Sequence, residues 1–189
     1  MKTLRFATIS FVLTTAAFAQ QAAPPCAGLP PGRHALLERL TAQLNLTCGQ
    51  QLKIEPLLHD EESVTKPLLK FTSLSQEEQQ GIMTTIKLAA RRQVRTQLTP
   101  EQQKGMDAEV ESVSKGGKKK GDAKKVDAAP GLEVEESLSQ AIVAYAALTP
   151  AEKNAMLLKV KQAARNDSAL QLTPAQQKQL DSEIQALKK

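Results

Sequence analysis

Aromatic residues are nearly absent from this chain of 189 residues, which contains four Phe, one Tyr and no Trp. A large cofactor pocket or a thick globular core is hard to build without bulky rings. Core positions must be filled by Leu, Ile, Val, Met and Ala, which suits thin layers of helices. Strand signals are missing as well, because no alternating β-branched run or hairpin turn occurs. We therefore expect an all-α fold.

Residues that commonly bind metal ions are also scarce. Beyond the initiator methionine, the chain has only two histidines and three methionines, which are His34, His59, Met83, Met106 and Met156. They form no His-rich cluster, and no two of them stand four positions apart on a helix, as a metal site on one helix face would need. A metal-sensing role is thus the weakest of the binding functions considered, and we expect no metal site.

Catalytic patterns are absent from the sequence too. It contains no Ser/His/Asp order, no glycine-rich phosphate loop and no metalloprotease motif. Glu61 and Glu62, echoed by Glu135 and Glu136, are paired carboxylates, but acidic residues are typical of an exposed first helical turn. We expect no enzymatic activity and no cofactor.

The one long apolar run lies at the N-terminus. Lys2 and Arg5 precede a mostly apolar stretch over residues 7–16, and Ala17-Phe18-Ala19 has the small-x-small pattern of a cleavage site. The run is too short to cross a bilayer. We predict a signal peptide over residues 1–19, no transmembrane segment and a periplasmic product. Its removal lowers the Lys and Arg count from 25 to 23 against 20 acidic residues, so the net charge falls to +3 and says little about nucleic acid. Export argues against a nucleic-acid partner.

Two cysteines, Cys26 and Cys48, remain after cleavage. In an oxidising compartment a disulfide between them is the expected state. It would tie a Pro-rich tail, residues 20–32, to the segment that follows. The alternative is a reactive Cys48, since the first turn of a helix favours a thiolate.

A short motif, Leu-Thr-x-x-Gln, recurs along the chain. It occurs at Leu46-Thr47-Cys48-Gly49-Gln50, at 98–102 (Leu98, Thr99, Gln102) and at 172–176 (Leu172, Thr173, Gln176), with relatives at 74–78 and at 148–152 (Leu148, Thr149). Thr or Ser followed three positions later by Gln or Glu forms a capping box, and Pro at the next position suits a first helical turn. Each copy therefore predicts the start of a helix. The leucine before each cap has no partner for a local hydrophobic staple and is expected to pack on another helix.

The motifs belong to a longer internal repeat. Shifted by 74 positions, residues 58–109 align with residues 132–183 without a gap. We predict two antiparallel helical modules, over residues 33–113 and 131–189. The clearest helix spans residues 76–96, and its counterpart has an apolar stripe from Met156 that ends with Leu170. Pro56 is expected to kink or end the helix that begins near residue 48, and Pro67 to interrupt the next one.

Glycine and lysine dominate residues 114–130 between the two modules. Like charge without apolar residues is typical of a flexible, solvated linker. A role in binding anionic lipid or another polyanion is the alternative.

An exported helical chain with these motifs resembles the LTxxQ family of periplasmic proteins, the Spy and CpxP type. The resemblance rests on Leu46, Thr47 and Gln50, on Leu98, Thr99 and Gln102, and on the later copies at Leu148, Thr149, Leu172, Thr173 and Gln176. It implies a thin, curved, cradle-like helical fold and a role as an ATP-independent chaperone or an envelope-stress adaptor. Family members usually pair as antiparallel dimers, so the duplicated module implies either a pseudo-dimer within one chain or a homodimer.

One helix face is a candidate binding surface for unfolded proteins. Its members are Ile82, Met83, Ile86, Lys87, Arg91, Arg92 and Arg95. Basic and aliphatic groups side by side could hold an unfolded chain through charge steering followed by apolar contact. The alternative is an ordinary solvated face beside a core stripe. The leading hypothesis is a holdase chaperone for unfolded or envelope proteins, and its rival is a non-catalytic adaptor with one specific envelope partner.

Overall fold

The protein is all-α throughout the residues described by the computed structural model, which are 26–29, 34–116 and 132–188. No strand occurs in those ranges. The elements in chain order are α1 (Ala35–Leu44), α2 (Cys48–Lys70), α3 (Gln76–Thr96), α4 (Pro100–Gly116), α5 (Leu132–Ala144), α6 (Pro150–Asn166), the 3-10 turn η1 (Ser168–Leu170) and α7 (Pro174–Leu187). The predicted signal peptide and most of the predicted tail and linker lie outside the described residues, and residues 114–116 belong to α4.

Every Leu-Thr-x-x-Gln segment and each of its relatives begins a helix, as predicted. The Thr47 hydroxyl accepts from the Gln50 backbone N–H at 3.3 Å, while Gln50 Oε1 accepts from the Thr47 N–H at 3.0 Å. The same reciprocal pair joins Ser75 with Glu78, Thr99 with Gln102, Thr149 with Glu152 and Thr173 with Gln176. These boxes satisfy backbone donors that the first turn of a helix leaves unpaired.

The leucine before each cap packs on other helices, which confirms the expectation drawn from the missing staple. Leu46 and Leu98 are buried in a smaller apolar cluster, and Leu74 and Leu148 in a larger one. Leu172 is partly buried against the larger cluster. One motif therefore sets the start of a helix and anchors that start in the core.

Helix α2 continues through both of its prolines, so the expectations that Pro56 ends it and that Pro67 interrupts the next helix are wrong. A proline inside a helix removes a backbone hydrogen bond and costs about 3 kcal/mol in isolation. Here tertiary packing offsets that cost, because one face of the helix is fully buried. The buried residues of that face are Ile54, Leu58, Val64 and Leu68.

Helix boundaries repeat at the offset of 74 found in the sequence. α3 begins at residue 76 and α6 at 150, α4 at 100 and α7 at 174, while α2 and α5 end at 70 and 144. We call α1–α4 the first half of the molecule and α5–α7 the second half. The repeat in the sequence is thus accompanied by a repeat of helix positions.

One boundary departs from the repeat. α3 continues to Thr96, whereas α6 ends at Asn166, so Leu170 lies in η1 and not at the end of the α6 stripe as expected. The Asp167 carboxylate accepts from the Ala169 backbone N–H at 2.8 Å and from the Ser73 hydroxyl at 2.6 Å. Short polar side chains that bond nearby backbone compete with the helix, which explains the early stop.

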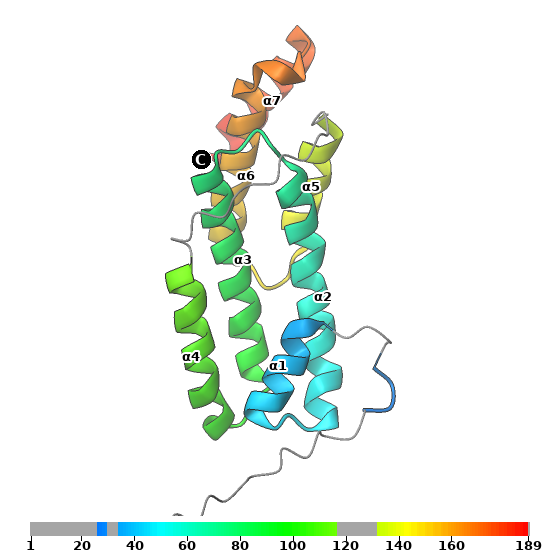
Figure 1. Ribbon diagram of the computed structural model, residues 1–189. Helices are drawn as coiled ribbons and strands as arrows, with labels where there is room; N and C mark the ends of the chain where they lie inside the picture. Colours follow the sequence, from blue (N-terminus) through cyan, green and yellow to red (C-terminus); the bar gives the residue numbers. More distant parts are fainter. Residues whose placement is uncertain (1–25, 30–33, 117–131, 189) are drawn as a thin grey trace, which may run out of the picture.

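The two halves pack on each other within one chain. Figure 1 shows α2, α3, α5 and α6 running side by side, with α1 and α4 at one end of the molecule and α7 at the other. The larger apolar cluster takes residues from both halves, among them Val64, Leu68, Ile86, Leu138, Ile142 and Val160. Ion pairing adds to this contact, because Arg92 of α3 lies 2.8 Å from Glu152 of α6. The predicted modules therefore share the larger apolar cluster, whereas the smaller one belongs to the first half alone.

A disulfide holds the segment before α1 against α2. Cys26 and Cys48 are bonded, as predicted, with their Cα atoms 5.3 Å apart. In the chain-entropy model a loop of this length contributes roughly 3 kcal/mol to stability. The bonded state excludes the free, reactive Cys48 that was the alternative.

Candidate functional site

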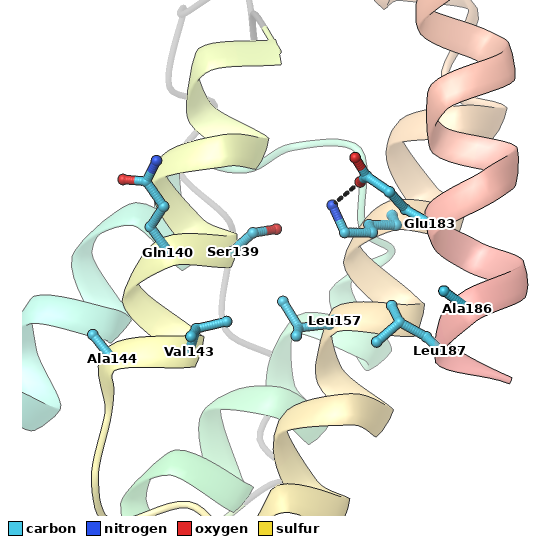
Figure 2. Close-up of a pocket in the computed structure, with 9 residues that line it drawn as sticks. Ser139, Gln140, Val143, Ala144, Leu157, Glu183, Ala186 and Leu187 are labelled. Carbon is cyan, nitrogen blue, oxygen red and sulfur yellow. Dashed lines mark hydrogen bonds and ion pairs between the residues drawn. The ribbon is translucent and has the colours of Figure 1, made fainter. Parts of the chain in front are cut away.

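An apolar groove opens between α5 and α7 above α6. Both outer helices pack on α6, and the space between them is a cavity of about 550 Å³. Figure 2 shows Val143 and Leu157 pointing into this space, with Ala186 and Leu187 of α7 on the opposite wall. The residues that line it are Ser139, Gln140, Val143, Ala144, Leu157, Lys161, Glu183, Ala186 and Leu187.

The groove continues toward the N-terminal ends of α5 and α7. A second cavity of about 340 Å³ lies there and shares four lining residues with the first: Ser139, Gln140, Lys161 and Glu183. Leu132 of α5 and Leu180 of α7 provide its apolar walls, while Glu135, Glu136, Gln176 and Gln179 provide its polar groups. The two cavities form one groove with an apolar end and a polar end, which we call the α5–α7 groove.

An ion-pair network crosses the middle of this groove. Lys161 Nζ lies 3.2 Å from Glu135 Oε1 and 2.5 Å from Glu183 Oε2, so one ammonium joins all three helices. The hydrogen bond from Lys161 holds the pKa of Glu183 below its ordinary value, although partial burial opposes it. Burial likewise acts to lower the pKa of Lys161, but the two carboxylates outweigh it and the pKa rises. Lys161 and Glu183 are therefore both charged at neutral pH.

Val143 is exposed at an unusual level for a large aliphatic residue, with 56% of its surface accessible. Its equivalent in the first half, Leu69, is 60% exposed. Single exposed aliphatic residues are common on protein surfaces. Val143 differs because it stands beside Leu157 and Leu187 in a groove, where a partner side chain can be enclosed.

The predicted basic and aliphatic face on α3 is not one open surface. Ile82 and Ile86 are buried in the larger apolar cluster, with 2% and 0% of their surface exposed. Arg91 is buried as well, and its Nη1 lies 2.7 Å from Glu61 Oε2 of α2. Amphipathic spacing alone does not show that an arginine faces inward, because the buried carboxylate that pairs with it comes from another helix.

The other two arginines of that face pair with two different helices. Arg92 pairs with Glu152 of α6, and Arg95 lies 3.2 Å from Asp107 of α4. Met83 and Lys87 stay partly exposed. At the offset of 74 these two correspond to Leu157 and Lys161, which line the α5–α7 groove. Two positions of the predicted face thus have equivalents in the groove of the second half, whereas the arginines of α3 pair with carboxylates of other helices.

The glutamines of the first two motifs have a role that the sequence did not reveal. Gln50 Nε2 donates to Gln102 Oε1 at 2.7 Å and to the Gln97 carbonyl at 3.0 Å. Gln102 Nε2 in turn donates to the carbonyl of Leu44 at 3.0 Å, at the end of α1. Each glutamine closes its own capping box and ties three helix ends together. We call this pair the glutamine clasp.

The two histidines lie apart from each other and from the groove. His34 caps α1, where its Nδ1 accepts from the Leu36 backbone N–H at 3.2 Å, and His59 is exposed on α2. Within the described ranges, no group of three His, Cys, Asp or Glu side chains is placed to hold a metal ion. No helix in the same ranges is long and apolar enough to cross a membrane.

The groove itself was missed at the level of sequence. Val143 and Leu187 look like ordinary members of an apolar stripe, and their spacing does not show that no other helix of the described residues covers them. The only available signal was the repeat, because the short leucine-rich segment that precedes the first motif lies outside the residues that the repeat aligns.

Comparison of this chain with family models, with curated proteins and with solved structures gives no match.

Proposed function

We propose that the protein is a holdase-type chaperone of the periplasm, which binds unfolded proteins without ATP. The observation that carries the proposal is the open α5–α7 groove, in which Val143, Leu157 and Leu187 line a cavity of about 550 Å³. An apolar recess rimmed by charged and polar groups is typical of a protein-binding site. Holding an unfolded chain needs such a surface and no catalytic group.

Two features of the chain support the proposed compartment. The sequence over residues 1–19 has the pattern of a signal peptide, and the bonded state of Cys26 and Cys48 suits an oxidising environment. The resemblance to the LTxxQ family rests on the four helix starts at Leu46, Leu98, Leu148 and Leu172, whose capping boxes are formed. Because these motifs act as caps, they support the helical fold, and the groove supports the activity.

A single chain is the proposed active unit. The two halves bury a common apolar cluster, so one molecule contains the helix pairing that a dimer would otherwise supply. A homodimer is the alternative. Sedimentation velocity at the concentrations used for activity separates them, since a chain of 20.5 kDa and its dimer differ twofold in mass.

The test is suppression of aggregation of several unrelated unfolded proteins, without ATP, at near-stoichiometric ratios. We expect light scattering to fall for each client, because the groove recognises aliphatic surface and no particular fold. If no client is protected while one envelope protein co-purifies with the chain, the chaperone proposal fails and the adaptor role replaces it. Heat-denatured chaperone and an equal mass of serum albumin serve as controls.

A further inference from the structure

Helix α1 shows what kind of segment this fold accepts between its outer helices. In the first half α1 packs against α2 and α4. Leu36, Leu37 and Leu40 are buried there in the smaller apolar cluster. The same cluster contains Leu58 of α2 and Met106 of α4. A ten-residue amphipathic helix is therefore held by leucines on one face.

Two residues of α4 shape the place where α1 ends. Gln102 donates to the Leu44 carbonyl, and a Cβ added to Gly105 would lie 2.6 Å from Leu44 Cδ2. That distance is shorter than any real Cβ contact, so Gly105 lets the leucine approach the helix closely. The α1 site thus combines a carbonyl-binding glutamine with room for a leucine side chain.

The equivalent place in the second half is an open cavity. At the offset of 74, Leu58 corresponds to Leu132, Gln102 to Gln176 and Met106 to Leu180. All three equivalents line the polar end of the α5–α7 groove. Gly105 is replaced by Gln179, which lies on the same wall. In the part of the chain that the structure describes, no helix of the second half takes the place of α1.

Charge in the groove indicates which helix would fit. Three carboxylates, Glu135, Glu136 and Glu183, line the polar end together with the single ammonium of Lys161. The excess is two negative charges, and Lys161 is already shared between two of the carboxylates. A bound segment that carries Lys or Arg beside its leucines would complement this excess.

The α1 helix of a second copy is not free to fill the groove. The disulfide between Cys26 and Cys48 ties the preceding segment to α2, and Leu37 and Leu40 are almost completely buried in their own half. Insertion of α1 from one copy into the groove of another would have to expose these leucines. We therefore look for the occupant in another protein and not in α1 of a second copy.

We propose that the α5–α7 groove binds an amphipathic helix of a client protein, with leucines spaced as in α1 and Lys or Arg beside them. Recognition of this kind, in which one helix face enters a groove, uses anchors at positions i, i+3, i+4 and i+7. α5 has 13 residues, which corresponds to a length of about 20 Å, so the groove matches a helix of roughly four turns. This inference rests on the proposed function and specifies its substrate class.

The probe is a fluorescein-labelled peptide of 16 residues that carries a leucine stripe and lysines on the flanks. One control peptide has the same composition with the leucines spread around the helix, and another has Glu in place of each Lys. Fluorescence anisotropy with the full chain gives the dissociation constants. We expect the striped Lys peptide to bind at least about tenfold tighter than either control, with a rise in helicity on binding. Val143→Glu should weaken it about tenfold, whereas Leu69→Glu, at the equivalent exposed position, should change it less than about twofold.

The outcomes separate this inference from the proposed function. Equal binding of the striped and spread peptides, or no effect of Val143→Glu, overturns the helix-binding proposal. If clients are protected in a manner sensitive to Val143 but the striped peptide does not compete, the chaperone stands and the helix specificity fails. If the peptide binds but no client is protected, the chaperone fails and helix recognition stands. A dimer that Val143→Glu dissociates would mean that a second copy fills the groove, which also overturns the inference.

Discussion

Arg91 and Arg165 occupy equivalent positions 74 residues apart, yet they do different things. The Arg91 side chain is 5% exposed and pairs at 2.7 Å with Glu61, which is equally buried. Arg165 is 34% exposed and pairs at 2.9 Å with Asp181 on α7. In the second half the equivalent of Glu61, Glu135, is taken by Lys161, one turn before Arg165. A repeated sequence therefore does not produce repeated contacts, because the choice of partner depends on which helices lie nearby.

The same contrast holds for the two halves as a whole. The first half is closed by α1, by the disulfide and by the glutamine clasp. The second half has no described counterpart of α1, and its motif glutamine, Gln176, closes only its capping box in the described contacts. The groove exists where that closure is missing. One half of the molecule is thus built for stability, and the other half provides the binding surface that we propose.

The largest expected effect concerns the two arginines. Arg91→Met leaves the carboxylate of Glu61 buried without its partner and should lower the free energy of unfolding by about 3–5 kcal/mol. Arg165→Met removes an exposed pair and should cost less than about 1 kcal/mol. Urea denaturation of both variants, followed by circular dichroism, gives the two values.

Rescue provides the control for this experiment. Adding Glu61→Leu to Arg91→Met removes the unpaired charge and should restore most of the lost stability. If the two single variants lose equal free energy of unfolding, the ion pair between Arg91 and Glu61 is not buried.

A smaller difference is expected for the motif glutamines. Gln102→Ala breaks its capping box, its bond to the Leu44 carbonyl and the clasp with Gln50, and should cost about 2 kcal/mol. Gln176→Ala breaks only the box and should cost about 1 kcal/mol or less. The midpoints of urea denaturation measure both. A larger loss for Gln176→Ala would reverse the assignment of the first half as the closed one.

The smallest expected effect is the pH dependence that Glu183 contributes in the second half. The pKa of Glu183 is lowered in the folded state, so its stabilising contribution is present above its ordinary pKa of 4.5 and is lost as pH falls through the lowered value. Glu183→Gln should therefore lower the melting temperature at pH 7 by only a few degrees, because the group is partly exposed. The difference from the unchanged protein should disappear in acid, once Glu183 is protonated in the folded state as well. A constant difference at all pH values would remove the ion pair as its cause.

The sequence predicted the helix starts because capping is local. The hydroxyl of Thr47 and the amide of Gln50 need only three residues of chain to meet, and their bonds form as expected. The prediction that the prolines end or interrupt the helix was wrong because their cost is local, while the packing that offsets this cost along α2 comes from other helices. The inward position of Arg91 depends on Glu61, which lies 30 residues away. Such a pairing cannot be obtained from the pattern of one helix.

The groove could not be predicted for a related reason. Its walls are ordinary helix faces, and among the residues that the structure describes no helix lies between them as α1 does in the first half. Val143 and Leu69 have similar exposure and equivalent positions. Only the arrangement of α5, α6 and α7 shows that Val143 borders an open apolar groove.

The most direct test is protection of one unfolded client by the unchanged protein, by Val143→Glu and by Leu69→Glu at equal concentration. Both variants place one charge on an exposed helix position, so their melting temperatures should stay close to that of the unchanged protein. We expect Val143→Glu to lose most of its suppression of light scattering and Leu69→Glu to keep it. Full protection by Val143→Glu, or an equal loss in both variants, would contradict the assignment of the α5–α7 groove as the binding site.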